Sequence, residues 1–346
     1  MKKHINNIKI KNLFNEKDVD WNLKPVNILV GKNGLGKSTI LRLIESVVTH
    51  NNPEDLNLCD EITVKLNNKK TYSGRKDKSN SSEILKKLID NILNSEEKNM
   101  SIEKSFNSYI DSKDVPPELF KDILKHIQKS VISNLNEESI AVDKNISIIE
   151  NVSGYRFESS AEKMEIEFIS TVNMSANSVN NIVKSTGERT ILLDDEIKDE
   201  LERLDRNNND NLSMKLCEKL INSLNNFFKE TGKTISIEKE SMIVTLNNGK
   251  KLKYQNLSSG ERQIIFIFLK VINGSVNNSL ILMDEPEISL HLSWQEKLLK
   301  EITKVNKSSQ IIIVTHSPAI VMNGWLDCLT DIDSIFTKNV DLNKES

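Results

Sequence analysis

The sequence predicts an α/β fold with a parallel sheet at its centre and a mainly helical insertion. Two continuous apolar runs, residues 280–283 and 311–314, are typical of parallel strands that are buried on both faces. A third apolar run, residues 26–30, leads into a glycine-rich turn and an amphipathic segment, as in a strand–turn–helix unit. Because these runs lie near the two ends of a 346-residue chain, we expect one domain built from both ends.

The N-terminal part of this domain is expected to cover residues 1–55. Ile8 and Ile10 alternate with lysines, which indicates a first strand. Pro25 precedes the run 26–30, at a strand start where a missing N–H is tolerated. Residues 37–48 place their apolar side chains on one face of a helix, which should end at residues 51–53, Asn-Asn-Pro.

The insertion, residues 56–165, is expected to form a lid of helices and strands. Alternation over residues 62–66 predicts the first strand of a β-hairpin, and the polar stretch 69–82 predicts a loop. Apolar stripes at helical spacing follow at residues 84–92 and 119–131. Such stripes favour packing over a cofactor site, and they are too short for a long coiled-coil arm.

The C-terminal part, residues 166–346, returns to the domain. Alternation at residues 164–168 predicts a strand, and residues 212–227 predict an amphipathic helix. Residues 234–237 and 242–246 indicate paired strands. Helices over residues 259–272 and 293–305 should cover the buried apolar strands.

The composition argues against several protein classes. The net charge is −3, so no overall basic field attracts nucleic acid, although lysines cluster between residues 65 and 78. The three cysteines are far apart, which argues against a zinc site or a disulfide framework and favours a reducing compartment. No run approaches the roughly 20 apolar residues that cross a bilayer. We therefore expect a cytoplasmic protein without a membrane segment.

The glycine-rich turn carries the first chemical motif. Eight residues match the pattern G-x-x-x-x-G-K-[ST], namely Gly31, Lys32, Asn33, Gly34, Leu35, Gly36, Lys37 and Ser38, and Thr39 follows them. Backbone N–H groups of such a turn, together with the helix start, surround phosphate groups. Lys37 offers a positive charge to the β- and γ-phosphates, and Ser38 offers a hydroxyl to Mg²⁺. The motif predicts that the chain binds a nucleoside triphosphate.

Two further groups of polar residues follow buried strands. Asp284 comes directly after residues 280–283, where a carboxylate can hold Mg²⁺ opposite Ser38. Glu285 is placed to accept a proton from the attacking water. His316 follows residues 311–314 after one threonine. Each feature alone could be structural, but the carboxyl ends of parallel strands meet at one sheet edge, so we expect them to converge on one phosphate chain.

Residues 257–263, Leu-Ser-Ser-Gly-Glu-Arg-Gln, resemble the signature motif of ATP-binding-cassette ATPases. A second helix start there would direct a group of residues at a phosphate, namely Ser258, Ser259, Gly260 and Glu261. The alternative is an ordinary helix cap. The order of the motifs is similar to this family over about residues 5–50 and 250–325, and residues 285–291 resemble the branch of RecF, the SMC-like repair ATPases and the overcoming-lysogenization-defect ATPases.

The resemblance implies a P-loop ATPase head that binds ATP and Mg²⁺ and hydrolyses ATP. It makes Lys37, Glu285 and His316 catalytic, with His316 contacting the γ-phosphate. Two heads would sandwich ATP in a homodimer or larger oligomer, each nucleotide touching residues 31–39 of one chain and 258–261 of the other. Members of this branch occur in bacterial anti-phage systems of the PARIS and Septu types, so a separate effector protein, such as a nuclease, is an expected partner.

Two alternatives stay open at this point. One is a repair or maintenance ATPase that clamps DNA, and the other is the ATPase subunit of a transporter. The sequence lacks a C-x-x-C hook, which argues against a true SMC-like repair ATPase. About thirty residues follow His316, too few for the Toprim nuclease of the overcoming-lysogenization-defect proteins. Beyond the ATPase residues, the sequence shows no nuclease-like cluster of acids and histidines. It also lacks a clear glutamine-bearing loop, for which residues 170–177 are the candidate replacement.

Overall fold

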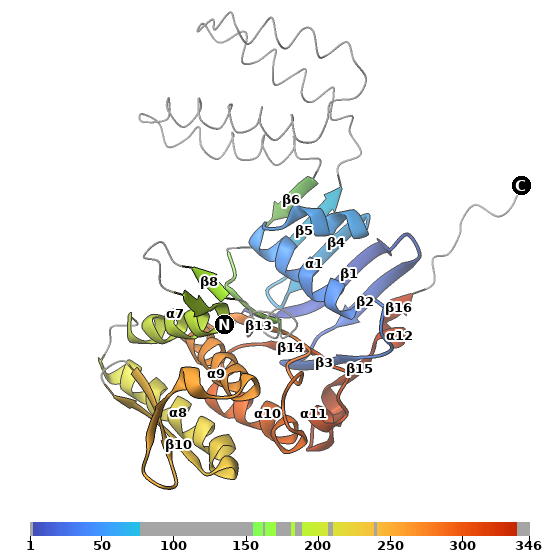
Figure 1. The fold of residues 1–346 in the computed structure, drawn as a ribbon. Coiled ribbons are helices and arrows are strands. Elements are labelled where there is room, and N and C mark those ends of the chain that lie inside the picture. The colour runs from blue at the N-terminus through green and yellow to red at the C-terminus, as the bar shows by residue number, and fades with distance from the viewer. Residues whose placement is uncertain are drawn as a thin grey trace, which may run out of the picture. The chain divides into compact units, whose positions relative to one another are not determined.

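The computed structural model describes residues 3–76, 155–161, 163–170, 181–183, 189–206, 210–238 and 241–337 (Figure 1). The chain divides into two compact units, one formed by Met1–Gly74 with Glu158–Ser346 and the other by Arg75–Phe157. Almost all described residues belong to the first unit. The two helices expected at residues 84–92 and 119–131 lie outside the described residues.

A five-stranded parallel sheet forms the centre of the first unit. Its order is β15 (Leu329–Asp331), β3 (Val26–Val30), β14 (Ile311–Val314), β13 (Leu280–Asp284) and β7 (Ile166–Ser170). All four strand pairs are parallel, and every residue of β13 and β14 is buried. The predicted parallel sheet of an α/β fold is therefore confirmed, and both ends of the chain contribute to it.

A second sheet is formed mainly by the N-terminal strands. Its order is β16 (Phe336–Thr337), β2 (Lys17–Asn22), β1 (Ile5–Leu13), β4 (Glu61–Leu66), β5 (Thr71–Lys76) and β6 (Tyr155–Ser159). Two expectations need correction. Residues 71–76, predicted as loop, form a strand, and residues 56–74, predicted in the lid, belong to the first unit because β4 pairs with β1.

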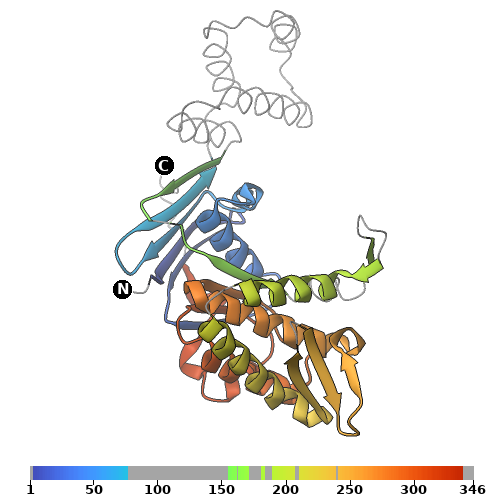
Figure 2. The same ribbon diagram turned by 90° about the vertical axis from the view of Figure 1, so that its left-hand side faces the viewer.

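Helix α1 (Lys37–Thr49) lies between the two sheets, as the side views show (Figure 2). It contacts β4 on one side and β13, β14 and β7 on the other. Its buried face carries the predicted apolar residues, listed here in order: Ile40, Leu41, Ile44, Val47 and Val48. Burial on two sides fixes the helix, and hence its N-terminal end, relative to the parallel strands.

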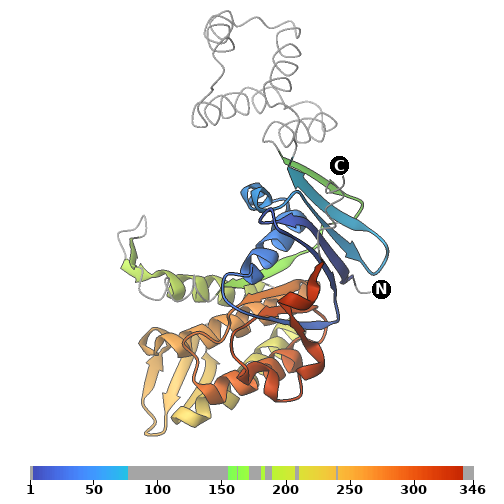
Figure 3. The same cartoon turned by 90° about the vertical axis from the view of Figure 1, so that its right-hand side faces the viewer.

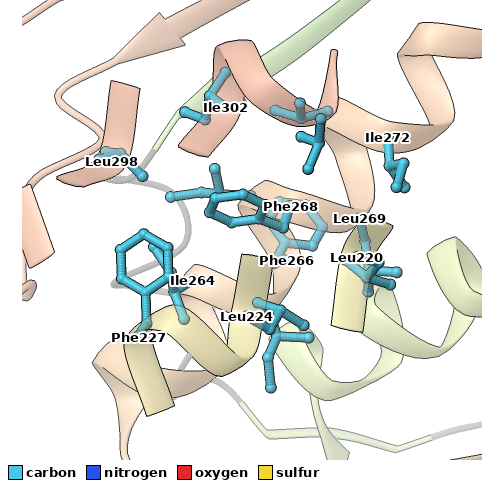
Figure 4. Close-up of a cluster of buried hydrophobic side chains, with 14 of the residues drawn as sticks. Leu220, Leu224, Phe227, Ile264, Phe266, Phe268, Leu269, Ile272, Leu298 and Ile302 are labelled. Carbon is cyan, nitrogen blue, oxygen red and sulfur yellow. The ribbon is translucent and has the colours of Figure 1, made fainter. Parts of the chain in front are cut away.

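Helix α9 (Ser259–Asn277) covers the opposite face by packing on β13 and β7. Three more helices pack around it: α7 (Leu192–Arg206), α8 (Asp210–Phe228) and α10 (Leu292–Val305). Their shared core, from Leu224 and Phe227 of α8 to Phe268 of α9 and Leu298 of α10, is fully buried (Figure 4). The rings of Phe227 and Phe268 meet edge to face at 5.5 Å, an arrangement that adds to the stability from burial.

A buried charged network joins β7, α7 and α9 beside this core. Arg203 lies 2.6 Å from Glu167, and Lys270 bridges Glu167 at 3.3 Å and Glu200 at 3.0 Å. Asn273 donates to Glu200 at 2.7 Å. Because both carboxylates have a cationic partner, the network tolerates burial and ties α7 to α9.

The remaining described elements are short. A three-stranded antiparallel sheet, β10 (Lys233–Glu238), β11 (Ser241–Leu246) and β12 (Lys251–Lys253), extends at one side (Figure 3). The others are β8 (Asn181–Val183), β9 (Arg189–Ile191), α11 (Ala319–Met322), α12 (Ile332–Ile335), η1 (Pro53–Leu58), η2 (Lys229–Thr231), η3 (Tyr254–Asn256) and η4 (Leu326–Cys328). Among the helices described, none is long and apolar enough to cross a membrane.

Candidate active site

The glycine-rich turn connects β3 to α1 in backbone conformations that favour glycine. Gly31, Gly34 and Gly36 have φ angles of 143°, 80° and 94°. A Cβ atom on Gly36 would also lie 2.6 Å from the ring of Phe14. Side chains at these positions would strain the backbone or collide, so this turn conformation requires glycine.

The N-terminus of α1 is open to an anion. Gly36 occupies the N-cap position, no described side chain caps the helix, and its first turn contains no acidic residue. The first amide groups of a helix lack partners inside the helix, and the helix dipole places partial positive charge there. The 13-residue helix α1 therefore presents N–H groups that have no partner within the helix and a favourable potential for phosphate.

Lys37 is held inside this turn. Its Nζ donates to the backbone oxygens of Gly31 and Lys32, both at 2.9 Å, and the residue is 4% exposed. Burial lowers the pKa of Lys37, while the carboxylates of Glu285, Asp284 and Asp331 oppose that shift. The ammonium is thus positioned at the turn by weak acceptors that a phosphate oxygen could replace.

Ser38 and Asp284 meet across the α1–β13 contact. The Ser38 hydroxyl donates to Oδ1 of Asp284 at 2.8 Å. Burial raises the pKa of Asp284, and the Ser38 bond together with the nearby Arg42 and Lys37 charges works in the opposite direction.

This pair fits Mg²⁺. Neighbouring ligands of an octahedral Mg²⁺ at about 2.1 Å lie about 3 Å apart, close to the observed separation of the two oxygens. Among the described residues no group of three or more potential metal ligands of the His, Cys, Asp and Glu types occurs. Mg²⁺ is usually bound by only one or two protein ligands, and phosphate oxygens and water complete its coordination.

Glu285 and His316 face each other at the carboxyl ends of β13 and β14. Nε2 of His316 lies 3.2 Å from Oε1 of Glu285, and both side chains are partly exposed. Glu285 has a φ of 50°, and its N–H donates to the Val314 oxygen at 2.8 Å. A bulky residue in the left-handed region is uncommon, and the backbone bond to β14 is one contact that stabilises this conformation at the sheet edge.

Two acidic residues near the site were not predicted as site residues. Asp331 ends β15, pairs in register with Val30, and adds to the negative charge around Lys37. Glu287 lies two residues after Glu285 and is buried. Only the strand order could reveal Asp331, because β15 pairs with β3 from about 300 residues away along the chain.

The predicted signature residues start α9 and are used within the chain. Ser258 is the N-cap, and its hydroxyl accepts from the Glu261 N–H at 3.4 Å, while Glu261 accepts from the Ser258 N–H at 3.0 Å. The Glu261 carboxylate also binds Lys233 at 2.5 Å. Burial works to raise the pKa of Glu261, but Lys233 and Ser258 outweigh it and the pKa is lowered. The helix cap considered as an alternative is therefore present, with Ser259 and Gly260 in the first turn.

The start of α9 contacts the turn that follows β13. Nε2 of Gln263 donates to the backbone oxygens of Ile288 at 2.7 Å and Pro286 at 3.3 Å. A Cβ on Gly260 would lie 2.5 Å from the Ser289 oxygen, so only glycine allows this approach. The signature segment is thereby linked to the turn that carries Glu285.

The structure brings together residues 31–39, Asp284, Glu285 and His316 around one edge of the parallel sheet. The signature residues belong to a separate helix start. Of the candidate glutamine-loop replacement, only Ser170, the last residue of β7, is described, and residues 171–177 lie outside the described residues.

The chain matches a known family over most of this fold. The model of the family described as "AAA domain, putative AbiEii toxin, Type IV TA system" matches residues 26–323. The chain belongs to this AAA family. The matched region runs from the start of β3 to beyond His316, so residues 31–39, Asp284, Glu285 and His316 all lie within the matched AAA domain.

Curated relatives of this AAA domain match shorter regions. The "Retron Ec83 probable ATPase" of Escherichia coli is 28% identical over 164 residues, covering 36% of this chain and 30% of that protein. The "Septu protein PtuA" of Bacillus thuringiensis is 33% identical over 93 residues, covering 23% of each. The chain spans less than a third of the length of these relatives.

A solved structure shares the fold. An Smc head bound to the C-winged helix domain of ScpA aligns with a TM-score of 0.50 at 12% identity, covering 92% of both chains. At this identity the likeness concerns the fold alone. It agrees with the predicted P-loop head of the ATP-binding-cassette type.

Proposed function

We propose that this AAA domain hydrolyses ATP with Mg²⁺ at the edge of its parallel sheet. The observation that carries the proposal is the convergence of three groups: Lys37 at an uncapped helix start, the Ser38–Asp284 pair and the Glu285–His316 pair. A triphosphate, a divalent cation and a water molecule are the ligands that these three groups suit.

Each group has a distinct task in the proposed reaction. The amides of the turn and the Lys37 ammonium bind the phosphates and offset their charge. Ser38 and Asp284 would hold Mg²⁺, which would supply charge stabilisation for the transferred phosphoryl group. Glu285 orients a water molecule and accepts its proton as the water oxygen bonds to the γ-phosphorus. The bond from that phosphorus to the β,γ-bridging oxygen then breaks, leaving ADP and phosphate.

His316 is placed to support this step. Its Nε2 lies 3.2 Å from Glu285, which orients the carboxylate and leaves the imidazole next to the reacting groups. A positioned donor that binds charge developing on the γ-phosphate acts mainly in the transition state. We therefore assign His316 a role in turnover rather than in initial ATP binding.

We further propose that a complete site needs two copies of the chain. Ser258, Ser259 and Gly260 begin a helix of 19 residues, and within the described chain this start is bonded to the turn after β13. Placed against the nucleotide of a second copy, the helix start would contact the ATP bound by that copy, so each nucleotide would touch both chains. ATP binding would then hold two heads together, and hydrolysis would release them.

The biological role proposed is anti-phage defence through a separate effector protein such as a nuclease. The support is the family match and the likeness to a Septu protein and a retron ATPase. Cells that carry this gene with its neighbouring genes should resist phage, and resistance should be lost with Lys37→Ala. Phage resistance in a Lys37→Ala strain would contradict the proposal that defence depends on ATP binding by this chain.

Phosphate release by the purified chain tests the chemical proposal directly. Wild-type protein should release phosphate only with both ATP and Mg²⁺, and Glu285→Gln should bind ATP but release phosphate slowly. Glu54→Gln, which changes an exposed acid in η1, is the matched control and should keep the wild-type rate. A wild-type rate in Glu285→Gln would exclude Glu285 as the base.

A further inference from the structure

Glu287 joins the two loops that carry the Glu285–His316 pair. The residue is 7% exposed, and its Oε1 accepts three hydrogen bonds from the loop after β14. The donors are the Thr315 hydroxyl at 2.7 Å, the His316 N–H at 2.9 Å and the Ser317 N–H at 3.2 Å. One carboxylate oxygen therefore fixes three consecutive residues, with His316 in the middle.

A second contact supports the same junction from α10. The Ser317 hydroxyl donates to Oε1 of Gln295 at 2.6 Å, and Nε2 of Gln295 donates to the Leu290 oxygen at 2.9 Å. The loop after β14 is thus fastened to the turn after β13 at two points. Since the Glu285 N–H also bonds to Val314, the backbones on both sides of the Glu285–His316 contact are fixed.

The other oxygen of Glu287 argues against a purely structural purpose. Within the described part of the chain, Oε2 is buried and has no hydrogen-bond partner. A buried carboxylate oxygen without a partner costs free energy that fastening a loop does not require, and an amide would hold the three donors through an uncharged, weaker acceptor. What the carboxylate adds over an amide is charge, which shortens and strengthens the bonds to the His316 loop.

We propose that Glu287 is a positioning residue that sets the distance between His316 and Glu285. The inference rests on the proposed role of His316 in turnover. Glu287 acts on the reacting groups indirectly, because it fixes the backbone that carries the His316 side chain. Its loss should therefore reduce kcat and leave the affinity for ATP nearly unchanged.

The test is a double-mutant cycle on steady-state phosphate release, using wild type, Glu287→Gln, His316→Ala and the combined variant. Misplacing a catalytic group by about 1 Å can lower the reaction rate about 100-fold, and smaller displacements lower it less. Glu287→Gln should therefore lower kcat about tenfold, with the KM for ATP within about twofold of wild type. In the His316→Ala background the same change should have no further effect on kcat. Glu301→Gln is the control. It removes a different buried carboxylate, on α10 and paired with Lys304, and should keep the wild-type kcat.

Thr315→Val provides an independent variant if Glu287→Gln does not fold. It removes one donor to Oε1 while keeping the shape of a fully buried side chain, and its effect should also disappear in the His316→Ala background. An equal loss of kcat in both backgrounds, or an unchanged kcat in Glu287→Gln, would overturn the positioning role. Wild-type turnover in His316→Ala would instead remove the role of His316 itself, and the positioning role with it.

Discussion

Replacing Lys37 by methionine should weaken ATP binding strongly, because two ordered hydrogen bonds and one positive charge are lost together. In the structure Nζ donates to the oxygens of Gly31 and Lys32 at 2.9 Å each, so the ammonium is already ordered at the turn. Binding exchanges these acceptors for charged phosphate oxygens. A hydrogen bond to a charged group contributes about 1.5–3 kcal/mol, so two such bonds to phosphate oxygens amount to about 3–6 kcal/mol of lost binding free energy. This corresponds to a Kd that is higher by roughly two to four orders of magnitude.

The same change has a consequence for pH dependence. Burial raises the pKa of Asp284, and Lys37 is one of the charges that lower it. Without Lys37 the pKa of Asp284 must rise further. Since the carboxylate form holds Mg²⁺, affinity for Mg-ATP in Lys37→Met should begin to fall at a higher pH than in wild type as the solution is acidified.

Isothermal titration calorimetry with Mg-ATP measures both effects, with Glu285→Gln as the background so that hydrolysis does not interfere. Lys65→Met, which removes an exposed lysine of β4, is the control for the loss of one positive charge. Circular dichroism should show that each variant is folded. A Kd for Lys37→Met within threefold of its parent would refute the assignment of Lys37 to the phosphates.

The remaining predictions concern catalysis, assembly and stability. Glu285→Gln should lower kcat by about 100-fold or more, as expected on loss of a general base, while the Kd for ATP changes little, which single-turnover assays can separate. Ser258→Arg should abolish activity without unfolding the chain, and mixing it with Lys37→Ala should restore activity from one intact composite site; full activity of a monomeric Ser258→Arg protein would contradict a shared site. Lys270→Met should destabilise the fold by about 1–3 kcal/mol in urea unfolding, because buried Glu167 keeps only its Arg203 partner, and an unchanged midpoint would show that the network adds no stability.

Local sequence patterns determined much of the fold and the core of the site. The strands 26–30 and 311–314 and the helix starting at Lys37 were predicted to within a residue or so, because continuous apolar runs and a glycine-rich turn leave few alternatives. The pairing of Ser38 with Asp284 also followed from sequence, since residues after parallel strands meet at one edge.

Long-range pairing could not be predicted in this way. Residues 56–74 were placed in the insertion, yet β4 joins β1 in the second sheet, a pairing that depends on backbone hydrogen bonds and carries no side-chain motif. Helix α7 was not predicted either. Its buried residues include Asp194 and Glu200, which are held by ion pairs to α9 and so weaken the apolar stripe that would reveal a helix.

The sequence by itself therefore determined that this chain has a P-loop motif, a candidate metal-binding acid and a candidate base, because each is a short motif beside an apolar strand. The tertiary structure alone decided how these groups are held. It showed that Glu261 closes a helix cap with Ser258, and that the loop of His316 is fixed by Glu287. The Ser-x-x-Glu spacing allows the cap but does not show that it forms, and the spacing of Glu287 and His316 along the chain carries no record of their hydrogen bond.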